Sequence, residues 1–231
     1  MLRISYLGQT SFALQSKETS VLLNPGIWNG SPIVADDYDA RVIVATNHLE
    51  DALGNATKIA EKSKSWILGN AETIEKAKQQ GGKPWLLHEL KAEIPYEIPG
   101  LKLTAFPLRR AVSGTPDRVE NLGLYIEMGR MRVAYLGDTM IRGPFGQLET
   151  EILIAPIGGD GVFPVKDAVS LCVDAKPRLA IPMRWKDADQ LAKFVRYVDQ
   201  FATGSVPLKM EPKQTVEVQW AAGNEFRHQL S

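Results

Sequence analysis

Four side chains that can serve acid–base or metal chemistry lie between residues 47 and 51. Asn47, His48, Glu50 and Asp51 follow the apolar run 42–44 and precede a helix-like stretch. A strand that leads through a turn into a helix is where an α/β protein often places its chemistry. Amide and carboxylate oxygens suit hard cations such as Mg²⁺, Mn²⁺ or Ca²⁺, and His48 can join them if the loop slips by one residue. This segment is therefore the first candidate for a site.

The elements that must position these residues are indicated by the spacing of apolar side chains. Short apolar runs separated by Gly, Pro and Asn predict a β-meander at the start of the chain, after which strands and helices alternate. The predicted strands are 2–7, 11–15, 20–23, 40–45, 66–68, 101–106, 122–127, 132–136, 152–155, 179–182 and 216–220, and the predicted helices are 55–64, 71–80, 165–175 and 187–202. This order predicts one α/β domain over residues 1–231, a four-layer αββα sandwich of mixed sheets with helices outside. Its two similar halves are roughly 1–100 and 101–231.

Composition and charge exclude several classes of protein. The chain has 27 basic and 27 acidic residues, and a net charge of zero does not favour binding to nucleic acid. The single cysteine, Cys172, excludes an intramolecular disulfide and a thiolate metal cluster. No apolar run approaches the roughly 18 residues that cross a bilayer. We therefore expect a cytoplasmic protein that binds neither nucleic acid nor membrane.

Five short motifs agree in order and spacing with one known family. They are YLGQTSF at 6–12, LLNP at 22–25, GDT at 137–139, APIGG at 155–159 and IPMRW at 181–185. Through these motifs the chain resembles the metallo-β-lactamase fold superfamily, in particular its short single-domain branch of metal-dependent hydrolases, which includes ascorbate-6-phosphate lactonase-like proteins. The resemblance implies an αββα sandwich, a zinc or manganese centre and hydrolase activity. Relatives in this branch often self-associate, so the resemblance also allows a homo-oligomer.

The chain departs from the family pattern at the metal ligands. The family segment T-H-x-H-x-D-H-L-G corresponds to residues 46–54, a fourth histidine is missing near 108–110, and the family's aspartate in the I-D-P turn is Asn24. The positions that have lost a histidine are Asn47, Leu49, Ala52 and Arg184. Leucine and alanine have no electron pair to donate, and arginine stays protonated.

Only Asp51 and Asp138 remain of the ligand set that the resemblance implies. Two carboxylates are too few for a zinc site of that kind. We therefore expect no metal cofactor and a non-hydrolytic protein, a pseudoenzyme with a degenerate metal site, which binds a small anionic metabolite or a protein partner. The alternative is an active hydrolase of lactones or phosphoesters that uses a non-zinc metal, or the carboxylates Asp51 and Asp138 themselves, for catalysis.

Arginine at two former ligand regions can restore positive charge without a metal. Such arginines can pair with Asp51 and Asp138 in an internal salt-bridge network, or hold a small anion through bidentate contacts, and both alternatives remain open. The candidate ligand-binding residues are Arg184, Arg109, Arg110, Asn47, His48, Thr139 and Trp185.

Overall fold

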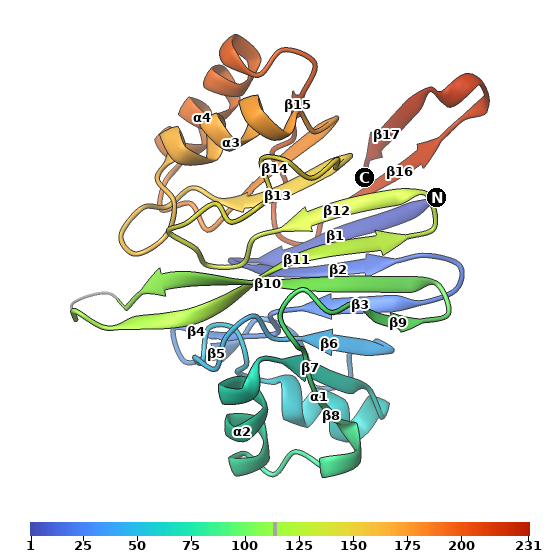
Figure 1. Cartoon of the computed structure of the whole chain (residues 1–231), viewed down its shortest axis with the longest axis vertical. Helices are drawn as coiled ribbons and strands as arrows, with labels where there is room; N and C mark the ends of the chain where they lie inside the picture. The colour runs from blue at the N-terminus through green and yellow to red at the C-terminus, as the bar shows by residue number, and fades with distance from the viewer. Residues whose placement is uncertain (113–114) are drawn as a thin grey trace. The chain divides into compact units, whose positions relative to one another are not determined.

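The computed structural model describes residues 1–112 and 115–231 (Figure 1). They form two compact units, unit 1 with residues 1–100 and 211–231 and unit 2 with residues 101–210. The sequence placed residues 211–231 with the second half. They belong instead to unit 1 because Val216 lies opposite Ile4 in an antiparallel ladder. In the described ranges, no helix is both long enough and apolar enough to span a membrane.

Unit 1 is built on a mixed sheet with the strand order β17-β16-β1-β2-β3-β6-β7-β8. Neighbouring strands pair antiparallel from β17 to β3 and parallel from β3 to β8. The strands of this sheet are β1 (Leu2–Gly8), β2 (Ser11–Gln15), β3 (Ser20–Leu23), β6 (Val42–Val44), β7 (Trp66–Gly69), β8 (Leu87–Glu89), β16 (Thr215–Trp220) and β17 (Phe226–Leu230). The remaining short elements are β4 (Ile27–Trp28), β5 (Ser31–Pro32), β9 (Tyr96–Ile98) and the 3₁₀ turns η1 (Pro84–Leu86) and η2 (Ala222–Asn224).

Two helices in unit 1 connect its parallel strands, as the crossover between parallel neighbours requires. Helix α1 (Ala56–Ser63) buries Ala56, Ile59 and Ala60 and is followed by Lys64 in the left-handed conformation, φ 59°. Helix α2 (Ala71–Gln79) begins after Asn70, whose side chain accepts the backbone N–H of Thr73 at 2.9 Å. An N-cap of this kind satisfies one of the free amide groups of the first turn.

Unit 2 contains strands in the order β15-β14-β13-β12-β11-β10. The pairs from β10 to β12 are antiparallel and those from β12 to β15 are parallel. The strands are β10 (Leu101–Ala111), β11 (Arg118–Met128), β12 (Met131–Tyr135), β13 (Ile152–Pro156), β14 (Leu179–Met183) and β15 (Val206–Pro207), and the helices are α3 (Val165–Ala175) and α4 (Ala188–Phe201). Figure 1 shows α3 and α4 side by side over β13 and β14.

The core of unit 2 lies beneath these two helices. Helix α4 buries Leu191, Phe194 and Val198 on one face, and these residues belong to the same apolar cluster as Phe145 and Phe163. Apolar positions three and four residues apart share one face of a helix, and this spacing predicted α4 correctly.

The predicted α/β class with mixed sheets is confirmed, and most element boundaries differ by no more than two residues. The structure extends β10 and β11 to 11 residues each and adds short strands, among them β8, β15 and β17. Four of the five residues of β17 are exposed. Its sequence therefore lacks the alternation of apolar and polar residues that predicts a half-buried strand.

Candidate functional site

The segments that carry the candidate residues of unit 1 meet at one edge of its sheet. Strands β3, β6 and β7 run parallel, with Leu23 opposite Val44 and Val44 opposite Leu68. Their carboxyl ends therefore lie side by side, and Asn24 and Asn47 follow two of them. Ligands of open α/β sheets bind at this edge.

A buried network of neutral groups centres on Asn24. Its Oδ1 accepts the backbone N–H of Thr46 at 2.8 Å, and its Nδ2 donates to Thr46 Oγ1 at 3.0 Å and to Thr10 Oγ1 at 3.4 Å. Ser11 Oγ donates to the carbonyl oxygen of Asn24. Asn24 has φ 45°, a left-handed conformation that asparagine tolerates better than most residues. The network ties the β1–β2 turn to the ends of β3 and β6, a role that sequence reasoning missed; the unusual Asn in the N-P-G turn was its signal.

The loop from Asn47 to Ala52 is packed against the segment that follows Asn24. Asn47 is fully buried, and its Oδ1 accepts the backbone N–H of Leu49 at 3.0 Å. A side chain at Gly26 would collide with the backbone carbonyl of Asp51, so only glycine permits this close approach. Ala52 is also fully buried. The lost ligand positions Asn47 and Ala52 are therefore part of the packing of unit 1, while Leu49 is partly exposed.

His48 was predicted as a possible ligand-binding residue, but its imidazole lies beside a side chain of another element. Its Nδ1 lies 3.2 Å from Oε2 of Glu72 in α2. The structure thus places His48 beside a carboxylate of the next helix.

In unit 2, three charged residues from separate segments of the chain come together. Arg110 in β10 and Arg184 after β14 both donate to Oδ2 of Asp138, which follows β12, at 2.8 Å and 3.1 Å between the nitrogen and oxygen atoms. The Asp138 side chain is 0 % exposed, that of Arg110 is 7 % and that of Arg184 is 16 %. We call these three residues the arginine–aspartate cluster. It carries two positive charges and one negative charge, so its surroundings favour anions over cations.

The backbone also constrains the cluster. Arg184 has φ 52°, a left-handed conformation that is costly for a long side chain, and a side chain at Gly158 would collide with the Arg184 carbonyl oxygen. Gly158 therefore allows the turn that brings Arg184 towards Asp138.

Three other predicted residues lie outside the cluster. Arg109 is exposed, because neighbouring residues of β10 alternate between faces and its neighbour Arg110 is buried. Thr139 is buried, and its hydroxyl donates to the carbonyl of Ile141 at 2.8 Å and accepts the N–H of the same residue at 3.0 Å. Trp185 is half-buried and packs on the apolar core of unit 2. Arg109, Thr139 and Trp185 thus have surroundings different from those of Arg110 and Arg184.

These residues do not fit the imidazole-rich zinc site that the sequence resemblance implies. Among the described residues, no group of three or more His, Cys, Asp and Glu side chains could hold a metal ion. The Asn47 amide oxygen already accepts a backbone N–H, and the Asp138 carboxylate already accepts from two guanidinium groups. A cation beside Asp138 would face both positive charges.

Comparison with known proteins places the chain in a family. A model described as the β-lactamase superfamily domain matches residues 3–184. A UPF0173 protein of Pyrococcus furiosus is 28% identical over 80% of this chain and 83% of its own length. A UPF0173 metal-dependent hydrolase of Methanopyrus kandleri is 25% identical over 94% of this chain and 100% of its own length.

Solved structures share the fold at low sequence identity. Igni18, described as a novel metallo hydrolase of Ignicoccus hospitalis, has a TM-score of 0.76 at 19% identity, covering 93% of this chain and 97% of its own. The metallo-β-lactamase fold protein YhfI of Bacillus subtilis has a TM-score of 0.73 at 13% identity, covering 93% and 98%. The Zn²⁺-bound PqqB of Methylobacterium extorquens has a TM-score of 0.66 at 12% identity, covering 92% and 99%.

These comparisons correct two expectations drawn from the missing histidines. The expectation of a non-hydrolytic pseudoenzyme is contradicted, because relatives that match most of the chain are named metal-dependent hydrolases. The expectation of no metal cofactor is contradicted by the same names. The expected family, in contrast, is confirmed. Since the family model spans residues 3–184, this chain belongs to the β-lactamase superfamily domain family.

Proposed function

We propose that this protein is a hydrolase of lactones or phosphoesters that depends on a metal ion. The observation that carries the proposal is the match to a UPF0173 metal-dependent hydrolase over 94% of this chain and 100% of the relative. A second relative of that name, from Staphylothermus marinus, is 29% identical over 80% of this chain. Matches of this extent support a shared reaction class, and they leave the choice of ion to the chemistry of this chain's own side chains.

Oxygen atoms are the donors that this chain offers near the family's ligand positions. Glu50 and Asp51 provide carboxylates in the loop after β6. Oxygen ligands suit Mg²⁺ and Mn²⁺ better than zinc, which prefers imidazole and thiolate in its protein sites. We therefore propose Mn²⁺ or Mg²⁺ as the activating ion and Asp51 as the residue whose loss affects activity most.

The guanidinium groups of the arginine–aspartate cluster in unit 2 are suited to an anionic ligand. Arg110 and Arg184 both approach Oδ2 of Asp138, so two guanidinium groups lie at one place in the fold. Guanidinium groups bind carboxylate and phosphate in a geometry that a lysine does not offer. We propose that the cluster favours substrates that carry a phosphate or a carboxylate.

The test is an assay of the full chain after treatment with a chelator. A γ-lactone and bis(p-nitrophenyl) phosphate are offered separately with Mn²⁺, Mg²⁺ or Zn²⁺. We expect turnover of one substrate class that requires Mn²⁺ or Mg²⁺ and falls about 100-fold or more in Asp51→Asn.

The matched control is Asp199→Asn, which neutralises an exposed carboxylate on α4 and should leave the rate unchanged. Absence of turnover for both substrates with all three ions would refute the hydrolase proposal. Full activity in the presence of the chelator would refute its metal dependence.

A further inference from the structure

A second concave site lies in unit 1 at the other edge of its sheet. Strands β3, β6 and β7 are parallel and begin near Ser20, Arg41 and Trp66, and all three residues line a pocket of about 490 Å³. Asn24 and Asn47 follow the opposite, carboxyl ends of the strands β3 and β6. Strands of three or four residues hold the two edges roughly 10 Å apart, so this pocket is separate from the candidate site.

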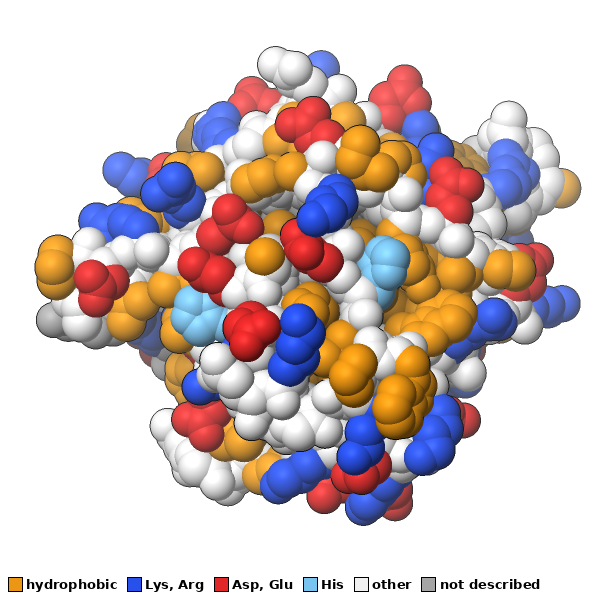
Figure 2. All heavy atoms as spheres, turned by 60° about the horizontal axis from the view of Figure 1, so that its bottom comes forward, with side chains coloured by type: hydrophobic (Ala, Val, Ile, Leu, Met, Phe, Trp, Pro, Cys, Tyr) orange, Lys and Arg blue, Asp and Glu red, His pale blue; other side chains and the backbone are white. Residues whose placement is uncertain are grey.

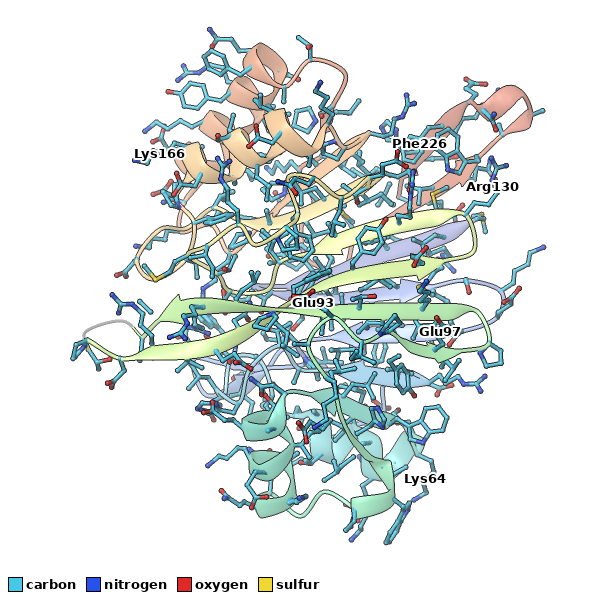
Figure 3. The ribbon with its side chains drawn as sticks, viewed as in Figure 1. Lys64, Glu93, Glu97, Arg130, Lys166 and Phe226 are labelled. Atoms are coloured by element: carbon cyan, nitrogen blue, oxygen red, sulfur yellow. The ribbon has the colours of Figure 1, made fainter. Side chains whose placement is uncertain are left out.

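Basic side chains outnumber acidic ones around this pocket. Lys17, Arg41 and Lys64 line it, together with the acidic residues Glu18 and Asp39. Lys64, labelled in Figure 3, follows the last turn of α1. Within the described ranges, the side chains of Lys17 and Arg41 take part in no ion pair. Three basic residues against two acidic ones give the pocket wall an excess of one positive charge, which favours a ligand that carries negative charge.

A residue of the pocket wall has a buried hydroxyl without a partner in the described part of the chain. Thr19 lines the pocket and is 6 % exposed, yet its Oγ1 has no hydrogen-bond partner among the described residues. A buried polar atom without a partner is uncommon in a folded protein, because it has lost its water without replacement. The Thr19 hydroxyl is therefore short of an acceptor from the described residues beside the pocket.

An aromatic side chain forms part of the pocket wall. Trp66 is half-buried, and the ring of Tyr96 meets it edge to face, with ring centroids 6.5 Å apart and an interplanar angle of 84°. Burial raises the pKa of Tyr96, while the positive charge of Arg41 lowers it. Figure 2 shows basic, acidic and hydrophobic side chains mixed on the face that it presents. An indole beside cationic groups suits a planar ring that carries an anion.

We propose that this pocket binds a mononucleotide. Its phosphate is held by Lys17, Arg41 and Lys64, and its base stacks on Trp66. The volume of about 490 Å³ lies in the range of small-molecule sites. Glu18 and Asp39 disfavour a longer phosphate chain by charge repulsion and offer acceptors for sugar hydroxyls. The proposal is independent of the hydrolase activity, because it concerns the other edge of the sheet.

Calorimetric titration of the full chain in a chelator tests the proposal without interference from metal-dependent hydrolysis. The probes are AMP, GMP, CMP and UMP, with adenosine, ribose 5-phosphate and inorganic phosphate as partial ligands. We expect at least one mononucleotide to bind, and the matching partial ligands to bind about 10-fold more weakly or worse. Failure of all four mononucleotides to bind, or inorganic phosphate binding as tightly as the best of them, would overturn the proposal.

Two variants locate the site. Arg41→Gln should weaken mononucleotide binding about 10-fold, and Trp66→Leu should do so by a similar factor. Arg41 is exposed, so Arg41→Gln remains informative if Trp66→Leu fails to fold. The matched controls are Lys58→Gln, which removes an exposed charge of α1 outside the pocket, and Asp51→Asn at the carboxyl edge. Unchanged affinity in Arg41→Gln, or a loss in Asp51→Asn, would contradict the assignment.

Discussion

The carboxyl ends of parallel strands are organised by different kinds of group in the two units. In unit 1 a neutral side chain, Asn24, joins neighbouring segments through hydrogen bonds to Thr46 and Thr10. In unit 2 a carboxylate, Asp138, joins them through two guanidinium groups. Both centres are buried, so their surroundings offer little water to replace a lost partner.

The difference between the two centres lies in what remains when the central residue is removed. Loss of the Asn24 side chain leaves an amide and hydroxyl groups short of partners, which costs the desolvation of neutral dipoles. Loss of the Asp138 charge leaves Arg110 and Arg184 facing each other in a poorly hydrated environment. We therefore expect the centre of unit 2 to tolerate substitution less well than the centre of unit 1.

The largest effect is expected for Asp138→Asn. The substitution keeps the size of the side chain and removes its charge, so the buried Arg110 and the half-buried Arg184 lose the ion pair with Asp138, at a cost of about 3–5 kcal/mol in the free energy of unfolding. Urea unfolding followed by circular dichroism measures this. Asp189→Asn breaks an exposed ion pair with Lys193 and should leave stability unchanged. A loss below about 1 kcal/mol in Asp138→Asn would show that the arginines find other partners, and the contrast between the units would fail.

A smaller loss is expected for Asn24→Ala. The variant removes three hydrogen bonds of the side chain and puts alanine at φ 45°, for a total of about 2–3 kcal/mol. Asn29→Ala separates the two contributions, since Asn29 has φ 49° but is exposed. Equal losses in the two variants would mean that the backbone conformation, and not the network, stabilises this edge.

The last comparison concerns alkaline pH and a buried acid of each unit, and the expected effect is small near pH 9 and grows above it. Burial raises the pKa of Cys172 in unit 2 to about 12 from its ordinary 9.0, and burial also raises the pKa of Tyr6 in unit 1 from its ordinary 10.0. A raised pKa in the folded state means that stability is full below the ordinary value and is lost as the pH rises above it. Stability should therefore fall from about pH 9, with the Tyr6 contribution beginning about one unit higher.

Unfolding in urea between about pH 8 and 11 distinguishes the two groups. Cys172→Ala should make the fall shallower from its onset, whereas Tyr6→Phe should change only its upper part. Identical profiles for Cys172→Ala and the parent chain would indicate that the thiol ionises without unfolding of its surroundings.

The sequence predicted the fold better than it predicted the neighbours of single side chains. Strands with apolar alternation and helices such as α4 followed directly from periodicity. In β10, however, burial passes from odd positions such as Leu103 to even positions such as Arg110 near Pro107. Alternation counted from the start of the strand could not separate Arg109 from Arg110, because the shift depends on what covers each face.

The prediction of function from the missing histidines failed for a different reason. The missing histidines led to the expectation of no metal cofactor, which the names of the relatives contradict. Missing residues give no information on the donors that a related hydrolase can use in their place. The sequence did not predict the hydrogen-bond partners of Asn24 either. Thr46 and Thr10 are distant from Asn24 in sequence and become its neighbours only when the strands pair. The periodic spacing of apolar residues predicts helices and strands, whereas hydrogen bonds between distant segments depend on the order of the strands in the sheet.

The pairing of β16 with β1 has a consequence for synthesis on the ribosome. Strand β2 follows β1 directly in the chain and can cover one edge of β1 early in synthesis. The other edge pairs with residues 215–218, which leave the ribosome only after all of unit 2. During that interval the nascent chain presents an open β-strand edge to its neighbours. We expect chaperones that shield such edges to raise the yield of folded protein, and ribosome stalling before residue 215 to promote aggregation.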